Sequence, residues 1–303
     1  MAEQEKQIND GSVISIILPT RGRVKSGALQ KSIESLLDNA KNPAKIEIML
    51  GVDDDDQESI DWVNDEAEKF MQKWGCACKA KVFKPLGYEQ LNVYVNLLCH
   101  SSTGNWLFLW NDDALMQTKD WEVEIQKYDG QFKCLAPKDN HDHPFAIFPL
   151  IPADWFTLCD SWSVNAQNDT WVSVIARMNG IFERINIEVL HDRADLTGGN
   201  DDETFENRKY MEGNPNDPQD FNHPNMVQAR MHHASKIDWF LKKIGVHTAP
   251  SPFEDFISGK VNPFEDVNKH NPKGAGQFDS INKDKQEPKS NKPRLPDDTK
   301  ISL

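Results

Sequence analysis

Three polar residues, Asn111, Asp112 and Asp113, follow directly on a run of apolar residues at 106–110. An apolar run without polar alternation predicts a strand that is buried on both faces of a parallel sheet. Ligands of such sheets bind at the carboxyl ends of the strands, so two carboxylates there are placed for binding. Carboxylate oxygens suit hard cations such as Mg²⁺ or Mn²⁺, which also bind phosphate. The alternative is a polar strand end that turns into solvent, which Asn and Asp also favour.

Patterns typical of strands and helices alternate along the chain before residue 111. They predict a strand at 13–18, a helix at 25–39, a strand at 46–52, a helix at 59–74, a strand at 79–84 and a helix at 89–100. This alternation is typical of an α/β sheet with right-handed crossovers. Two of the strands end in acidic clusters, and the first ends in the basic turn Pro19-Thr20-Arg21-Gly22-Arg23.

Three segments, ISIILPTRGR, LGVDDDD and GYEQLNVYVNLLCHSSTGNWLFLWNDDALM, together resemble a family 2 glycosyltransferase of the GT-A fold. The resemblance covers residues 12–125 and, more weakly, 145–212. It implies a Rossmann-like, mostly parallel central sheet flanked by helices, with a nucleotide-sugar half at 12–125 and an acceptor half at 126–212. Compact soluble enzymes that resemble this chain also occur in bacteriophages, where they attach sugars to modified DNA bases.

The resemblance implies that the first-strand turn holds the nucleoside of a nucleotide-sugar, expected to be UDP-linked. Pro19, Thr20 and Arg21 stand at the matching positions. Arg21 and Arg23 could also meet the diphosphate through charge-assisted hydrogen bonds. The alternative for both arginines is an ordinary exposed turn.

The resemblance also implies that Asp53 contacts the base of the nucleotide. It occupies the position of the acidic residue that accepts a hydrogen bond from the base in family members. Asp54, Asp55 and Asp56 are expected to be solvated or to cap the helix that begins near Gln57. The chain departs from the family at Leu91, because many members carry an arginine before the following asparagine.

The metal-binding "D-x-D" of the family maps to Asn111-Asp112-Asp113, so its first acid is an asparagine here. Asp113 is the predicted direct ligand, and Asp112 is expected to contact the ribose, or the metal through water. Relatives place a metal-ligating histidine at a point comparable to His191, and an imidazole ligand favours Mn²⁺ over Mg²⁺. Arg193 could neutralise the leaving diphosphate.

Asp169 is the predicted catalytic base. Transfer with inversion needs a base that deprotonates the acceptor hydroxyl, and the family carries this base in an acidic element at a helix start. Here Asn168-Asp169-Thr170-Trp171 opens a predicted helix at 169–178. The alternative is a first-turn acid that is favoured by the helix dipole. The polar segment 191–202 is predicted to close as a lid over the donor, with a surface loop as its alternative.

The composition narrows the expected cellular location of the protein and the expected acceptor of the sugar. The 303 residues carry a net charge of −14 and contain neither a signal-like apolar segment nor an apolar run long enough to span a membrane. Five cysteines without zinc-site spacing fit a reducing cytoplasm, or a host cytoplasm if the protein is viral. An acidic protein repels polyphosphate, which argues against nucleic acid as acceptor; saccharide, lipid-linked sugar and protein hydroxyls stay open.

The C-terminal part is predicted to consist of a helical extension at 213–257 and a disordered tail at 258–303. The tail contains nine Lys and Arg against seven Asp and Glu, so it carries +2 and the rest of the chain −16. Pro-Phe-Glu-Asp occurs at 252–255 and at 263–266, either to bind a protein partner or to dock onto the domain. Trp155, Trp162 and Trp171 are expected mostly in the core, with stacking on a sugar as the alternative.

Two other functions remain open at this stage. In the first, the protein is a catalytically degenerate binding or scaffold protein that acts through its tail. The loss of the first acid at Asn111 and of the arginine at Leu91 would fit such a loss of catalysis. A nucleotidyltransferase shares the broad architecture, but it carries a glycine-rich basic signature whose spacing Arg21–Gly27 does not reproduce.

Overall fold

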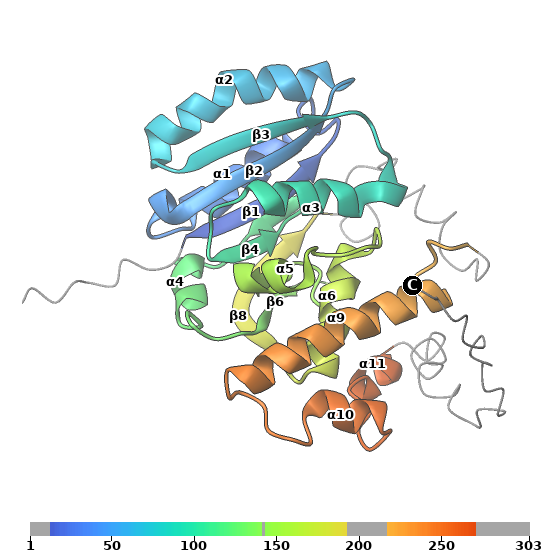
Figure 1. The fold of residues 1–303 in the computed structure, drawn as a ribbon. Helices are drawn as coiled ribbons and strands as arrows, with labels where there is room; N and C mark the ends of the chain where they lie inside the picture. Colours follow the sequence, from blue (N-terminus) through green and yellow to red (C-terminus); the bar gives the residue numbers. More distant parts are fainter. Residues whose placement is uncertain (1–12, 141–142, 193–216, 271–303) are drawn as a thin grey trace, which may run out of the picture.

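The computed structural model describes residues 13–140, 143–192 and 217–270 (Figure 1). The first half contains β1 (Ile14–Thr20), α1 (Ala28–Asp38), η1 (Pro43–Lys45), β2 (Ile46–Asp53), α2 (Gln57–Trp74), β3 (Ala77–Phe83), η2 (Tyr88–Gln90), α3 (Leu91–Ser101), β4 (Trp106–Leu109) and β5 (Ala114–Met116). The second half contains α4 (Trp121–Gln126), β6 (Cys134–Asp139), β7 (Leu150–Pro152), α5 (Ala153–Cys159), α6 (Asn168–Met178), β8 (Phe182–His191), α9 (Pro224–Lys243), α10 (Pro252–Ile257) and α11 (Glu265–His270). The predicted strand and helix alternation is confirmed, whereas β5 was not predicted.

In the described part of the chain, eight strands form one sheet in the order β3-β2-β1-β4-β7-β6-β8-β5. The strands β3, β2, β1 and β4 are parallel neighbours. β7 runs antiparallel to β4 and β6, β6 and β8 are parallel, and β5 is antiparallel to β8. The predicted α/β fold is therefore confirmed, with a parallel first half and a mixed second half.

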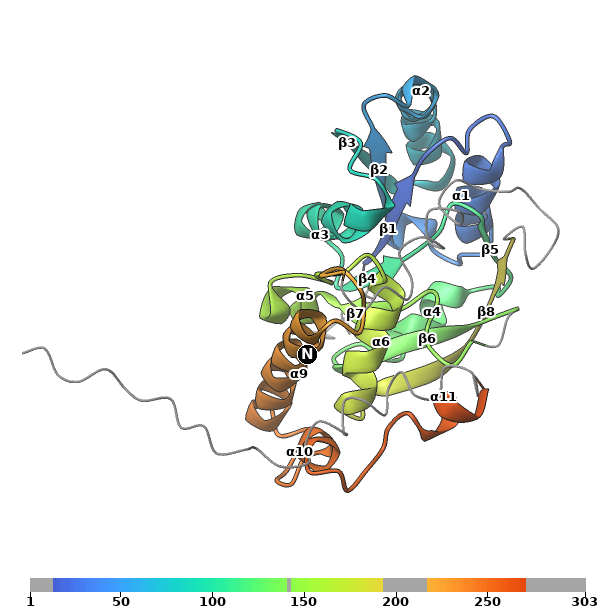
Figure 2. The ribbon, with the colours of Figure 1, turned by 90° about the vertical axis from the view of Figure 1, so that its right-hand side faces the viewer.

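Helices cover both faces of this sheet (Figure 2). Ile14, Ile16 and Leu18 of β1 pack in one core cluster with residues of α1 and α2. Ile17 packs in the other cluster, with residues of α3, α5 and α6. Because both faces are buried, β1 is apolar along nearly its whole length, as expected for a central strand. Among the helices of the described ranges, none combines the length and the apolarity needed to cross a membrane.

Helix α10, in the C-terminal part of the described chain, packs onto α6 and α9. Figure 1 shows α10 below α9. The prediction of disorder from residue 258 is wrong for residues 258–270, because Phe264 and Val267 are buried in the core there. The polar composition hid this packing, since a few well-placed apolar residues are enough to anchor a short segment. Residues 271–303 of the predicted tail lie outside the described residues.

Both Pro-Phe-Glu-Asp repeats bury their phenylalanines, Phe253 and Phe264, in the same core cluster. The first repeat begins α10, where Ser251 and Glu254 form a capping box. The second repeat contacts α6, because Arg177 donates to the Pro263 carbonyl at 3.2 Å and pairs with Asp266 at 3.0 Å. Of the two interpretations of the repeats, docking onto the domain is the one for which the structure provides contacts.

Gly104 lies directly against β1, beside a buried carboxylate. Its backbone N–H donates to Ser15 Oγ at 2.9 Å, and the Ser15 hydroxyl donates to Glu47 Oε2 at 2.5 Å. The backbone N–H of Thr103 and the ammonium of Lys79 also contact Glu47, at 2.8 and 2.6 Å. Burial raises the pKa of Glu47, but these hydrogen bonds outweigh burial and hold the pKa below its ordinary value. This network fixes the start of β4 against β1.

Replacing Gly104 by alanine is expected to lower the free energy of unfolding by about 1–3 kcal/mol, as overpacking typically does. The new Cβ would lie 2.5 Å from Ser15 Oγ and 2.7 Å from the Ser15 backbone nitrogen. Gly51→Ala is the matched control, since the two atoms nearest to its Cβ would be side-chain atoms of Leu98 and Phe83, at 3.2 and 3.3 Å, and the nearest backbone atom, Pro19 Cα, lies at an ordinary contact distance of 3.6 Å. Urea denaturation measures both losses, and equal losses would contradict the backbone clash as the cause.

Candidate functional site

Four of the predicted site residues meet where β1 and β4 end. Thr20, the last residue of β1, donates its hydroxyl to Asp112 Oδ2 at 2.7 Å. Arg23 lies close to both carboxylates of the acidic cluster, with Nε 3.4 Å from Asp112 Oδ1 and a terminal nitrogen 4.0 Å from Asp113 Oδ2. Both aspartates are only about 15% exposed. The parallel pairing of β1 and β4 therefore brings the basic turn and the acidic cluster together.

His191 joins this cluster from the far edge of the sheet. It ends β8, where the antiparallel pairing places it opposite Ala114 of β5. The backbone N–H of Asp192 donates to the Asp113 carbonyl at 2.9 Å. His191 Nε2 lies 3.3 Å from Asp113 Oδ1 and 3.3 Å from Asn111 Nδ2. Asn111 thus contacts the predicted histidine ligand.

Asp113 carries a buried carboxylate oxygen without a hydrogen bond. His191 Nε2 lies 3.3 Å from Oδ1, close enough for an ion pair, but Oδ1 accepts no hydrogen bond from the described residues. Burial raises the pKa of Asp113, yet His191 and the charge of Arg23 outweigh it and lower the pKa overall. Asp113 is therefore favoured as an anion.

Asp113 and His191 could supply some, but not all, of the ligands of a divalent cation. In the described residues, no three His, Cys, Asp or Glu side chains converge to hold a metal by themselves. Mg²⁺ sites at phosphates commonly use only one or two carboxylates, and the substrate and water supply the other ligands. The orphaned Asp113 oxygen and the imidazole nitrogen of His191, 3.3 Å apart, could provide two neighbouring ligands of such a site. Asp112 is committed to Thr20 and Arg23, which fits an indirect role.

Asp53 forms a second cluster at the end of β2. Its Oδ2 accepts from Arg21 at 2.8 Å, and its Oδ1 accepts from the Tyr94 hydroxyl at 2.5 Å. Arg21 also contacts Asp55 at 2.5 Å, and these carboxylates raise the pKa of the guanidinium. Arg21 therefore belongs to the cluster around Asp53, while Arg23 faces the predicted metal ligands. No local pattern pointed to Tyr94, because it lies 41 residues from Asp53 along the chain.

Asp56 caps α2, as one of the two interpretations of the aspartate run predicted. Its Oδ2 also accepts from the backbone N–H of Gly22 at 2.8 Å. Burial raises the pKa of Asp56, but hydrogen bonds from Ser59 and Gly22 outweigh burial and lower the pKa below its ordinary value. The capping residue of α2 therefore also holds the turn that follows β1.

Asp169 lies in the first turn of α6, half-buried. Its Oδ1 accepts from the backbone N–H of Thr170 at 2.7 Å and from the Thr170 hydroxyl at 3.3 Å. The loop before α6 is held by α3, because Asn96 Oδ1 accepts from the backbone N–H of Trp162 at 2.7 Å. Helix α3 also carries Tyr94, so it connects the cluster around Asp53 to the helix that bears the predicted catalytic base.

Pro19 lies within β1 and pairs with Gly51 in the β1–β2 register, one residue before Thr20. Arg193 and the predicted lid beyond Asp192 lie outside the described residues. Trp155, Trp162 and Trp171 are fully buried, so the core interpretation is confirmed for all three.

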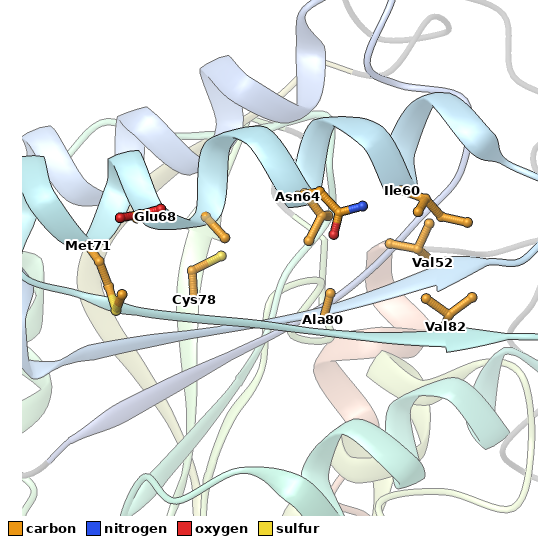
Figure 3. Close-up of a pocket in the computed structure, with 10 residues that line it drawn as sticks. Val52, Ile60, Asn64, Glu68, Met71, Cys78, Ala80 and Val82 are labelled. Carbon is orange, nitrogen blue, oxygen red and sulfur yellow. The ribbon is translucent and has the colours of Figure 1, made fainter.

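A groove of about 540 Å³ lies elsewhere, between α2 and the edge strand β3 (Figure 3). Apolar side chains such as Val52, Ile60 and Val82 line much of it. Among the described residues that line it, Glu68 is the one that carries a charge. The charged strand ends, rather than this groove, therefore form the candidate site.

The sequence matches no protein-family model and no curated protein. Among solved structures, the UDP-GlcNAc complex of S. aureus TarS 1-349, a GT-A-type glycosyltransferase, has a TM-score of 0.51 at 13% identity. This match covers 89% of the present chain and 79% of that chain. Another structure of TarS 1-349 gives a TM-score of 0.46 at 12% identity, over 77% of this chain and 74% of that one.

The UDP complex of TarS 1-349 gives a TM-score of 0.43 at 13% identity, over 59% of this chain and 58% of that chain. At such identities a likeness speaks for the fold alone. The match at 0.51, together with the curled eight-stranded sheet of the described residues, establishes that the chain has the GT-A fold.

Proposed function

We propose that this protein is a metal-dependent glycosyltransferase that moves a sugar from a UDP-linked donor to an acceptor hydroxyl, with inversion at the anomeric carbon. The observation that carries the proposal is the convergence of Thr20, Arg23, Asp112, Asp113 and His191 from three strand ends. The fold likeness to a TarS structure that contains UDP-GlcNAc supports the choice of donor class.

Each cluster has a distinct role in this proposal. Asp53 reads the base, and Arg23 lies where it can add positive charge beside the diphosphate. Asp113 and His191 would hold Mn²⁺ or Mg²⁺, with Asp112 acting indirectly. When bound, such a cation neutralises the charge that develops on the departing diphosphate.

Asp169 acts as the general base in a single displacement. The acceptor oxygen bonds to the anomeric carbon as the bond between that carbon and the diphosphate oxygen breaks. The carboxylate of Asp169 takes the proton of the acceptor hydroxyl, and the electron pair of the broken bond leaves with UDP. Attack from the face opposite the leaving group inverts the anomeric centre.

The acceptor is proposed to be a saccharide rather than a modified DNA base, and the reaction is placed in the cytoplasm. A chain with net charge −14 repels a polyphosphate, and this repulsion disfavours nucleic acid. Asn111 favours a second candidate, a GT-A-like binding protein without catalysis, because it removes one acid from the metal-binding motif.

Calorimetric titration with UDP tests the proposal directly. UDP is expected to bind in the presence of Mn²⁺ with a dissociation constant of about 1 µM to 1 mM, as is typical of enzyme substrates. Removal of the metal with EDTA is expected to weaken this binding strongly. Mg²⁺, GDP and dTDP are the comparison ligands. If UDP, GDP and dTDP all fail to bind with metal present, the proposed function is wrong.

A further inference from the structure

Tyr94 is a buried tyrosine whose hydroxyl has both a fixed donor and a fixed acceptor. The backbone N–H of Leu86 donates to the hydroxyl oxygen at 2.8 Å, and the hydroxyl donates to Asp53 Oδ1 at 2.5 Å. The ring is 6% exposed and packs edge-on against Phe83, with centroids 5.0 Å apart. Burial raises the pKa of Tyr94 to about 12, and the hydrogen bond to Asp53 adds to this, so the phenol keeps its proton.

The direction of these hydrogen bonds determines what Asp53 can accept. Because the Leu86 N–H can only donate, the Tyr94 proton has to point at Asp53. Asp53 Oδ1 therefore accepts this proton, and Oδ2 is the oxygen of Asp53 that faces Arg21 and a ligand can reach in its place. An ionised carboxylate is an acceptor only, so a ligand group that bonds to Oδ2 has to be a donor. Tyr94 thus fixes the position and the orientation of this acceptor.

The other partner of Asp53 is exchangeable. The Arg21 side chain is 50% exposed and contacts Asp55 through two nitrogens, at 2.5 and 3.0 Å, besides its contact with Asp53. Arg21 can therefore remain with Asp55 when a ligand approaches Asp53 Oδ2. Tyr94 cannot withdraw in this way, because the Phe83 ring and the Leu86 N–H enclose it.

We propose that Tyr94 is a positioning residue for base selection, which holds Asp53 as an acceptor for a ring N–H and thereby favours uracil over cytosine. This inference rests on the proposed function, in which Asp53 reads the base. Uracil presents an N–H at ring position three, whereas cytosine presents an acceptor nitrogen there. A site built to accept a substrate N–H strongly rejects an analogue that lacks it.

Titration of Tyr94→Phe with UDP and CDP, both with Mn²⁺, tests this inference. Wild-type protein is expected to prefer UDP by at least about tenfold. The variant keeps the ring against Phe83 but removes the hydrogen bond to a charged group, so its UDP affinity is expected to fall about tenfold. CDP does not use the fixed acceptor, so its affinity is expected to change little and the preference to shrink.

Tyr128→Phe serves as the matched control, because this tyrosine follows α4 and packs against the core cluster that contains residues of β1 and α1. Thermal unfolding of both variants reports on the fold. If Tyr94→Phe keeps the wild-type preference, or loses affinity for both nucleotides equally, Tyr94 has no role in selection and the inference is overturned. If wild-type protein binds neither nucleotide, the proposed function itself has failed, and the inference falls with it.

Discussion

Replacing Asp113 by asparagine is expected to abolish Mn²⁺-dependent binding of UDP while the fold remains intact. Loss of an outer-shell partner alone lowers metal affinity by about 10–100-fold, so loss of a charged ligand is expected to lower it at least about 100-fold. The asparagine keeps the shape of the side chain and its place beside His191. Calorimetry with UDP and Mn²⁺ measures the loss.

Stability distinguishes a functional Asp113 from a structural one. The carboxylate is buried, and its Oδ1 accepts no hydrogen bond from the described residues. His191 and Arg23 nevertheless lower the pKa of Asp113, so the ionised side chain contributes to the stability of the folded protein. Because asparagine keeps the shape of the side chain, Asp113→Asn is expected to lower the melting temperature only slightly. A marked drop in melting temperature would indicate instead that the contact with His191 serves mainly to hold β5 and β8 in place.

Asp54→Asn is the matched control for the lost charge. Asp54 is an exposed acid that directly follows β2, at the same edge of the sheet. Its substitution changes the net charge by the same amount but removes no proposed ligand. If Asp113→Asn binds UDP and Mn²⁺ as well as the Asp54 variant does, Asp113 is not a metal ligand.

Replacing Asp169 by asparagine is expected to lower the rate of sugar transfer about 10²–10⁴-fold, which is the usual contribution of a general base. The affinity for UDP and Mn²⁺ is expected to stay at the wild-type value, since Asp169 contacts neither in the proposal. Asparagine retains an oxygen that can accept from the Thr170 N–H, so the start of α6 keeps its local hydrogen bond. Transfer assays and calorimetry on one preparation separate the two effects.

Asp154→Asn is the control variant, because it shows how much the transfer rate changes when an acid in the first turn of a helix is lost. Asp154 is likewise an acid in the first turn of a helix, α5, where it can favour the helix through the dipole. If Asp169→Asn slows transfer no more than Asp154→Asn does, Asp169 is only a first-turn acid. The base then has to be sought elsewhere in the acceptor half.

The scaffold alternative predicts that the tail carries the function. A deletion that tests this idea has to begin after His270, because Phe253, Phe256 and Phe264 belong to the core. A longer deletion would remove core residues and lose activity through unfolding. If deletion of residues 271–303 abolishes biological activity while Asp169→Asn has no effect, the protein acts through its tail.

Local sequence patterns determined the first half of the fold. The apolar runs of β1, β2 and β4 are buried on both faces, and α1 and α3 bury apolar residues at helical spacing. These signals depend on residues two to four positions apart, which is why they can be read without knowledge of the partners. The polar residues after each strand were therefore correctly placed at the strand ends.

The tertiary structure decided which side chains at the strand ends contact one another. His191 reaches Asp113 only because β5, which the sequence did not reveal, pairs antiparallel with β8. Tyr94 looked like an ordinary helix residue, and only the packing of α3 against the sheet brings its hydroxyl to Asp53. Arg21 and Arg23 looked equivalent in the turn, yet they face different acidic clusters.

The C-terminal region shows the same division. Its composition predicted disorder from residue 258, but Phe264 and Val267 are held in a core cluster that includes residues of α6, α9 and α10. Composition measures how much apolar surface a segment has, whereas burial also depends on the surface that the rest of the chain offers. The sequence by itself therefore determined the α/β order and the candidate residues. The long-range pairing that no local period encodes decided which of them meet.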